Sequence, residues 1–188
     1  MKNIVLIGFM ASGKTEIGKE LAQQLHYNFV DIDDELEKKL NKSIKKIHET
    51  IPLEQINDYE QEIVNNIYIL KNQLIALNMK AVYNDHLMRI LKHNSIVIFL
   101  QTDLQYSLKF AIEDEKKNKK YRLIIDHYID VNHFQKCKKY STALRLLTDL
   151  NLLYKQYSDY KIDVRDKTID ILSKNIYNLL NTKYRFSF

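Results

Sequence analysis

The chain has 188 residues, 45% of them hydrophobic, with one cysteine and a formal net charge of +5 at pH 7. This length and composition predict a single soluble domain over residues 1–188, and they exclude a disulfide-stabilised fold and a membrane-spanning protein. Met1 to Asn3 precede only four apolar residues, too few for a signal peptide, so we expect the protein in the cytoplasm.

The hydrophobic pattern predicts short strands that alternate with helices. Compact apolar segments, typical of buried strands, occur at residues 2–7, 28–32, 74–77, 95–100 and 160–164. Helical periodicity predicts helices at residues 13–25, 35–40, 53–71, 85–92, 103–115, 134–157 and 166–180. This alternation indicates an α/β fold with a parallel sheet that helices cover on both faces.

A phosphate-binding motif follows the first predicted strand. Residues 8–15, Gly-Phe-Met-Ala-Ser-Gly-Lys-Thr, fit the P-loop pattern GxxxxGK[ST] between a strand and a helix, and all three glycines of the chain lie within residues 4–18. Main-chain N–H groups at a helix N-terminus bind anions, Lys14 would reach the β- and γ-phosphates, and the Thr15 hydroxyl would bind Mg²⁺. We predict that a nucleotide contacts Gly8, Ala11, Ser12, Gly13, Lys14, Thr15 and Glu16.

Two aspartates, Asp31 and Asp33, end the second predicted strand. If that strand neighbours the P-loop strand, its carboxyl end faces the crevice in which open α/β sheets bind ligands. Residues two apart share one side of a strand, so we expect both carboxylates in the site. The alternative is that one of them only caps a helix that begins near Asp34.

The remaining polar features give weaker indications. The densest basic run, residues 116–122, is either a solvated helix end or part of a phosphate-covering lid at about residues 114–132. The six histidines lack metal-ligand spacing. Nucleic acid is a disfavoured ligand, because 24 acidic residues are interleaved with the basic ones and no known binding signature is present. The amphipathic tail, residues 184–188, could bind a protein partner.

The chain resembles the shikimate kinase family at Gly8-Phe9-Met10, at Gly18 and at residues 29–33, Phe-Val-Asp-Ile-Asp. The resemblance implies a three-layer P-loop NTPase fold with a five-stranded parallel sheet, like that of the nucleoside monophosphate kinases. It also implies that Mg·ATP is the phosphoryl donor. Ala11 replaces a glycine that is usual in the family, and alanine is tolerated there if its φ is negative.

The resemblance further implies roles for individual residues. Thr15 and Asp31 would hold Mg²⁺, and Asp33 would position or deprotonate the acceptor hydroxyl. Lys14 and Arg122 would stabilise charge on the transferred phosphoryl group, since Arg122 lies near the position of the family's lid arginine. These assignments describe an ATP-dependent small-molecule kinase.

The acceptor half of the expected site departs from the family. Glu60 matches the glutamate of the family's FRxxE segment, but Asn78-Met79-Lys80 replaces a Gly-Gly-Gly turn, and Asn57 and Leu150 replace two substrate-binding arginines. Losing two charge-assisted contacts costs about 3–6 kcal/mol, or on the order of 10²- to 10⁴-fold in affinity. We therefore expect a small hydroxylated acceptor other than shikimate. The alternative is a catalytically inactive relative that binds a nucleotide or a protein partner.

Overall fold

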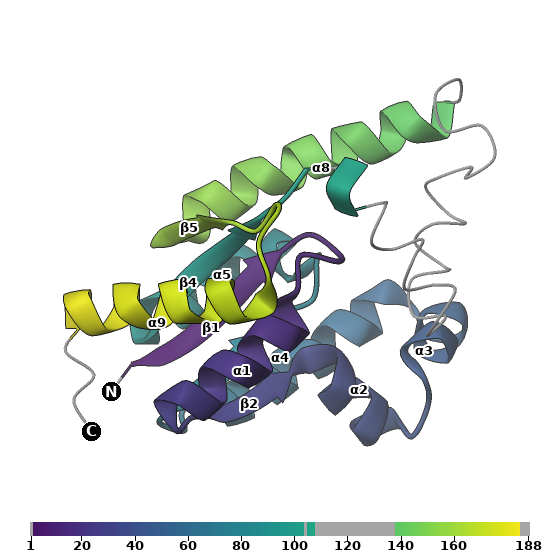
Figure 1. Ribbon diagram of the computed structural model, residues 1–188. Coiled ribbons are helices and arrows are strands. Elements are labelled where there is room, and N and C mark those ends of the chain that lie inside the picture. Colours follow the sequence, from purple (N-terminus) through teal and green to yellow (C-terminus); the bar gives the residue numbers. More distant parts are fainter. Residues whose placement is uncertain (1, 104, 108–137, 185–188) are drawn as a thin grey trace.

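One parallel β-sheet organises the molecule (Figure 1), for which the computed structural model describes residues 2–103, 105–107 and 138–184. The strands lie in the order β2-β3-β1-β4-β5. Their bounds are β1 Asn3–Gly8, β2 Asn28–Asp31, β3 Gln73–Ala76, β4 Ser95–Gln101 and β5 Tyr160–Asp163. The five-stranded parallel sheet confirms the predicted fold class.

Helices connect the strands and cover both faces of the sheet (Figure 1). The described helices are α1 Lys14–Leu25, α2 Ile32–Leu40, α3 Ile44–Thr50, α4 Leu53–Tyr68, the 3₁₀ turn η1 Ala81–Tyr83, α5 Asp85–Asn94, α8 Lys138–Tyr157 and α9 Ile169–Tyr184. Helices α1 and α9 pack side by side on one face, whereas α4, α5 and α8 contribute to the core on the other. The result is the three-layer arrangement expected from the alternation of elements.

The central strand β1 is apolar on both faces because both faces are covered. Ile4 and Leu6 point into the core beneath α1 and α9, and Val5 and Ile7 point into the opposite core. All four side chains are fully buried. This double burial explains why the strand reads as a continuous apolar run instead of an alternating one.

Helix α1 packs closely on the sheet at Gly18. A Cβ atom at that position would lie 2.4 Å from the ring of Phe29 and 3.2 Å from the side chain of Leu74. The absence of a side chain at Gly18 therefore permits the close approach of helix and sheet.

Several element boundaries differ from the sequence prediction. Helix α3 is missing from it because only one of its residues, Ile47, is buried, so no periodic apolar stripe marks the helix. Helix α9 begins at Ile169 instead of residue 166, since Asp166 has a φ of +56° that a right-handed helix cannot contain. Helix α4 ends at Tyr68, three residues before the predicted end.

Parts of the prediction lie outside the described residues. These are most of the predicted helix 103–115, the start of the helix at 134, the lid at about 114–132 with Arg122, Cys137, and the tail after residue 184. Within the described ranges, no helix combines the length and apolar character that crossing a bilayer requires.

Candidate nucleotide and acceptor site

The P-loop connects the carboxyl end of β1 to the amino end of α1. Local geometry explains why Gly8 and Gly13 are glycines. A Cβ atom on Gly8 would lie 2.6 Å from the carbonyl oxygen of Leu100 on the adjacent strand. Gly13 has a φ of +79° and precedes the first residue of α1. Any larger residue at Gly8 would collide with backbone, and one at Gly13 would be strained.

Ala11 adopts a left-handed conformation, with a φ of +53°. The condition of a negative φ at this position is therefore not met. An L-residue pays about 1–2 kcal/mol for this conformation, which a glycine would avoid. The loop thus contains a strained residue where the family usually has the residue that relieves such strain.

Two polar side chains of the loop, Lys14 and Ser12, lie in positions that suit an anionic ligand. The ammonium group of Lys14 donates hydrogen bonds to the carbonyl oxygens of Gly8 at 2.9 Å and Phe9 at 2.8 Å, which holds the positive charge over the loop. The Ser12 hydroxyl is buried and finds no hydrogen-bond partner among the described residues. A buried hydroxyl without a partner is unfavourable by about 1–3 kcal/mol, and a phosphate oxygen could satisfy it.

Asp31 joins β2 to the P-loop. Its carboxylate accepts a hydrogen bond of 2.6 Å from the Thr15 hydroxyl and another of 3.1 Å from the N–H of Asp33, so the same side chain caps α2 and contacts the P-loop. Hydroxyl and carboxylate oxygens are ligands that Mg²⁺ accepts, usually together with waters and substrate phosphates. This donor pair fits such an ion without a larger cluster of protein ligands.

The prediction that placed Asp31 and Asp33 in the site is wrong in two details. Strand β2 does not neighbour β1, because β3 lies between them. Asp33 is not on the strand but in the first turn of α2, since the helix already begins at Ile32. Asp31 nevertheless reaches Thr15 because α1 contacts both β3 and β2 on its way between β1 and β2, which brings the first turn of the helix toward the end of β2.

A cavity of about 370 Å³ opens beside the P-loop. It brings together most of the predicted site residues with residues of α3, α4 and the turn after β3. Its lining comprises Met10, Ala11, Ser12, Gly13, Lys14, Thr15, Glu16, Asp31, Asp33, Ile44, Lys45, His48, Leu53, Asn57, Glu60, Leu77, Asn78, Met79 and Lys80. Gly8 does not line it, and Arg122 lies outside the described residues.

Glu60 places a buried carboxyl group in the wall of this cavity. Burial raises its pKa from 4.5 to about 7; the hydrogen bond with the Asn78 side chain opposes this rise, and the charge of Asp33 adds to it. The group is therefore partly protonated at neutral pH, and it can either donate or accept a hydrogen bond there.

The two positions that carry arginine in the family lie in different surroundings in this protein. Leu150 is fully buried in the core, whereas Asn57 lines the cavity. Sequence patterns did not point to Lys45, His48 or Lys80, which also line the cavity. The lysine in Asn78-Met79-Lys80 was the available signal, since this turn follows a sheet strand at the ligand-binding edge.

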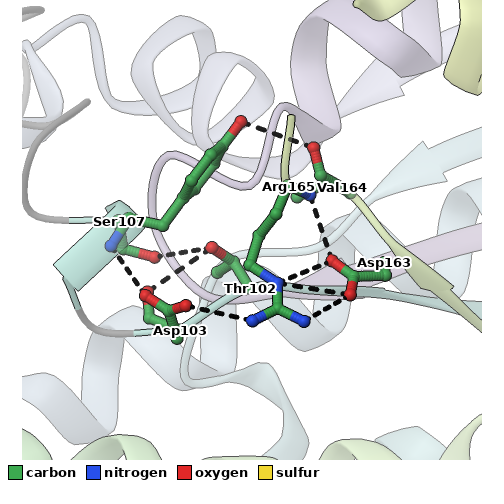
Figure 2. A network of polar contacts seen from close by, with 7 residues as sticks. Thr102, Asp103, Ser107, Asp163, Val164 and Arg165 are labelled. Atoms are coloured by element: carbon green, nitrogen blue, oxygen red, sulfur yellow. Dashed lines mark hydrogen bonds and ion pairs between the residues drawn. The ribbon is translucent and has the colours of Figure 1, made fainter. Parts of the chain in front are cut away.

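A second polar cluster lies at the carboxyl ends of β4 and β5 (Figure 2). The Arg165 guanidinium donates to the Asp163 carboxylate, with one contact of 2.5 Å, and to the Asp103 carboxylate at 3.3 Å. The hydrogen bonds from Arg165 lower the pKa of Asp163 to about 2. A cavity of about 470 Å³, partly lined by these residues, adjoins the cluster. No sequence pattern predicted this network.

Comparison with known proteins identifies relatives of the chain. The family model described as shikimate kinase matches residues 10–181. The shikimate kinase of Caldanaerobacter subterraneus subsp. tengcongensis is 30% identical over 186 residues, and that of Thermoanaerobacter pseudethanolicus is 32% identical over 176 residues; each match covers 94% of both chains. A solved structure of shikimate kinase from Acinetobacter baumannii in complex with shikimate superposes with a TM-score of 0.81, at 24% identity, over 98% of this chain and 95% of that one.

Proposed function

Because the chain belongs to the shikimate kinase family, a family of P-loop small-molecule kinases that use ATP and a divalent metal ion, we propose that it transfers the γ-phosphoryl group of ATP to a hydroxyl group of a small metabolite. In this proposal residues 8–16 bind the phosphates, and Thr15 and Asp31 hold Mg²⁺. The ion, when bound, neutralises phosphate charge. A cytoplasmic location, where ATP is abundant, suits this reaction.

The observation that carries the proposal is the 2.6 Å contact between Thr15 and Asp31 at the mouth of the P-loop. It joins the motif hydroxyl to a carboxylate from another strand, and neither residue needs this arrangement for core packing. The unsatisfied Ser12 hydroxyl and the inward-folded Lys14 ammonium support an anionic ligand at the same loop.

The acceptor would bind in the cavity of about 370 Å³ that the P-loop lines, on the side formed by α3, α4 and the turn after β3. Asp33, which lines that cavity, would position the acceptor hydroxyl and take its proton as the hydroxyl oxygen attacks the γ-phosphorus. The bond between the γ-phosphorus and the β,γ-bridging oxygen breaks, and ADP leaves. Lys14 would stabilise the charge on the transferred group, together with Arg122.

The second cavity is our candidate for the purine base of the nucleotide. The start of α9, which follows the loop after β5, approaches the P-loop, since a Cβ atom on Gly13 would lie 3.7 Å from the side chain of Ile169. Carboxylates such as Asp103 and Asp163 accept hydrogen bonds of the kind that the amino group of a purine donates.

A transfer assay tests the proposed function. Radiolabelled ATP is incubated with the protein, Mg²⁺ and a panel of polyols, sugar acids, nucleosides and shikimate, and each acceptor is assayed against the hydrolysis background. We expect one class of acceptor to be phosphorylated, and Lys14→Met to abolish both transfer and Mg·ATP binding. The matched control is Lys19→Met, five residues later on the exposed side of α1.

The second candidate function is nucleotide binding without catalysis. Two observations favour it. Ala11 has a strained backbone conformation, and a buried leucine, Leu150, replaces a substrate-binding arginine of the family. Mg·ATP binding by calorimetry, lost in Lys14→Met, with no transfer to any acceptor in the panel, would support this function over the first.

A further inference from the structure

The turn after β3, residues 78–80, keeps its shape without the glycines that the family has at this place. The side-chain oxygen of Asn78 accepts hydrogen bonds from the N–H groups of Lys80 at 3.0 Å and Ala81 at 2.8 Å. The same side chain is hydrogen-bonded to Glu60 on α4. The start of the turn is therefore held by a side chain of its own and by a neighbouring helix.

The hydroxyl group of Tyr154, on α8, holds the middle of this turn. It donates a hydrogen bond of 2.7 Å to the Met79 carbonyl oxygen. Burial raises the pKa of Tyr154 well above its usual value, so the hydroxyl keeps its proton and remains a donor across the physiological pH range. Loss of this donor would leave a buried carbonyl oxygen without its partner, which is unfavourable. The bond therefore favours one position of the main chain at Met79.

The hydroxyl is the part of Tyr154 that core packing does not require. The whole side chain is inaccessible to solvent, and its ring packs against that of Phe99 on β4, with 5.0 Å between the ring centroids. A phenylalanine would fill the same apolar space and bring no polar group into the core, where a hydroxyl is unfavourable unless it is hydrogen-bonded. The contact with Met79 thus explains why this position carries a hydroxyl.

The same contact connects α8 to the acceptor side of the site. None of the described residues of α8 lines the cavity of about 370 Å³, whereas Asn78, Met79 and Lys80 all do. Leu150, about one turn before Tyr154, is a core residue at the position of a substrate-binding arginine of the family. The bond from Tyr154 therefore links the helix to the cavity wall at a point where the helix itself brings no charge.

We propose that Tyr154 is a positioning residue, whose hydroxyl holds the main chain at Met79 and so fixes the acceptor side of the cavity before the acceptor binds. This inference rests on the proposed kinase function and adds a residue to it. A cavity wall that is already in place does not have to be ordered when a ligand binds, and such ordering weakens binding. Tyr154 should therefore affect the affinity for the acceptor and not that for Mg·ATP, which the P-loop binds.

Removal of the hydroxyl alone tests this role. Tyr154→Phe should raise the KM for the acceptor that is phosphorylated fastest in the transfer assay about 3- to 10-fold, as expected for loss of one hydrogen bond, and should leave the Kd for Mg·ATP within about twofold. The matched control is Tyr157→Phe, also on α8, because the Tyr157 hydroxyl donates to the Asp85 carboxylate on α5 instead of to the turn. This control loses the same kind of bond and should change neither constant.

Methyl NMR follows the turn without any acceptor. The chain has four methionines, of which Met79 reports on the turn and the fully buried Met88 on the core. With isotope-labelled methionine methyl groups, we expect one sharp Met79 signal in the wild-type protein. It should broaden or split in Tyr154→Phe and stay unchanged in Tyr157→Phe. The Met88 signal should remain sharp in all three proteins, which would show that the core is intact.

The outcomes separate the two proposals. An unchanged acceptor KM or an unchanged Met79 signal in Tyr154→Phe would overturn the role of Tyr154, and so would an equal rise of the KM in Tyr157→Phe. If Tyr154→Phe does not fold, the wild-type protein decides, because a Met79 signal that is broad and sharpens only when the acceptor and Mg·ADP are added contradicts a preformed wall. Absence of transfer to every acceptor in the panel would instead overturn the proposed kinase function, and the Met79 signals would still show whether the Tyr154 hydroxyl fixes the turn.

Discussion

The Thr15 hydroxyl donates a hydrogen bond of 2.6 Å to the carboxylate of Asp31, which joins the first turn of α1 to the end of β2. Asp31 is buried, and its other oxygen caps α2 through the N–H of Asp33. One side chain therefore stabilises a helix start and lies beside the hydroxyl that the P-loop motif assigns to Mg²⁺. These two roles can be separated experimentally.

Asp31→Asn should weaken the response to Mg²⁺ and leave the fold intact. Asparagine caps helices about as well as aspartate, so the free energy of unfolding should change by less than about 1 kcal/mol. Removal of the charge should raise the Mg²⁺ concentration needed for half-maximal ATP binding at least about tenfold, the equivalent of one charge-assisted contact. Calorimetric titration of ATP at several Mg²⁺ concentrations measures this effect. Asp34→Asn, on the same helix and outside the cavity, is the control and should behave like wild type.

Ala11→Gly should stabilise the protein, although most alanine-to-glycine substitutions destabilise. Relief of the left-handed strain at φ +53° is worth about 1–2 kcal/mol, and the added freedom of the unfolded chain opposes it by about 0.4–1 kcal/mol. The net gain should reach about 1 kcal/mol in urea unfolding. Ala22→Gly, inside α1, should lose about 1 kcal/mol in the same experiment. Equal losses in both variants would contradict the backbone conformation at Ala11.

Gly18→Ala should destabilise the protein even though alanine is the better helix former. The new methyl group would lie 2.4 Å from the Phe29 ring, and overpacking of this kind costs about 1–3 kcal/mol, against a gain of up to about 1 kcal/mol in helix propensity. Urea unfolding of the single variants and of Gly18→Ala/Phe29→Leu forms a double-mutant cycle. We expect the smaller side chain at residue 29 to recover part of the loss, and strictly additive effects would refute the contact.

Glu60→Gln should remove a pH dependence of stability. In the wild-type protein the pKa of Glu60 is about 7 in the folded state, against 4.5 for the solvent-exposed group of the unfolded chain, so the folded chain binds more protons between these two values. The free energy of unfolding therefore falls as pH rises from 4.5 to 7, by as much as about 3 kcal/mol. Urea unfolding at pH 5 and pH 8.5 should show a smaller difference in Glu60→Gln than in wild type.

Its control is Glu54→Gln, an exposed position in the first turn of the same helix α4. This variant should keep the wild-type difference between the two pH values. The same difference in Glu60→Gln as in wild type would show that Glu60 is not the group responsible. Glutamine at residue 60 can still accept the hydrogen bond from Asn78, so the substitution changes the charge more than the contact.

The order of the strands shows which kind of information the sequence lacks. The segment 74–77 is a weak strand by pattern because it is short, yet β3 is fully buried and separates β1 from β2. Strand order depends on pairing between distant segments, which a local pattern does not record. For the same reason Asp31 was assigned to the site through a neighbour relation that does not exist.

Local chemistry, in contrast, was readable from the sequence. The P-loop motif, its position between strand and helix, the α/β alternation and the family followed from short-range patterns, because glycine placement and hydrophobic periodicity are properties of consecutive residues. The contacts made by Asp31, the burial of Glu60 and the gathering of Lys45 with Lys80 depend on packing between elements that lie far apart in the chain. Only the tertiary structure could decide these, since burial and charge proximity arise when such elements meet.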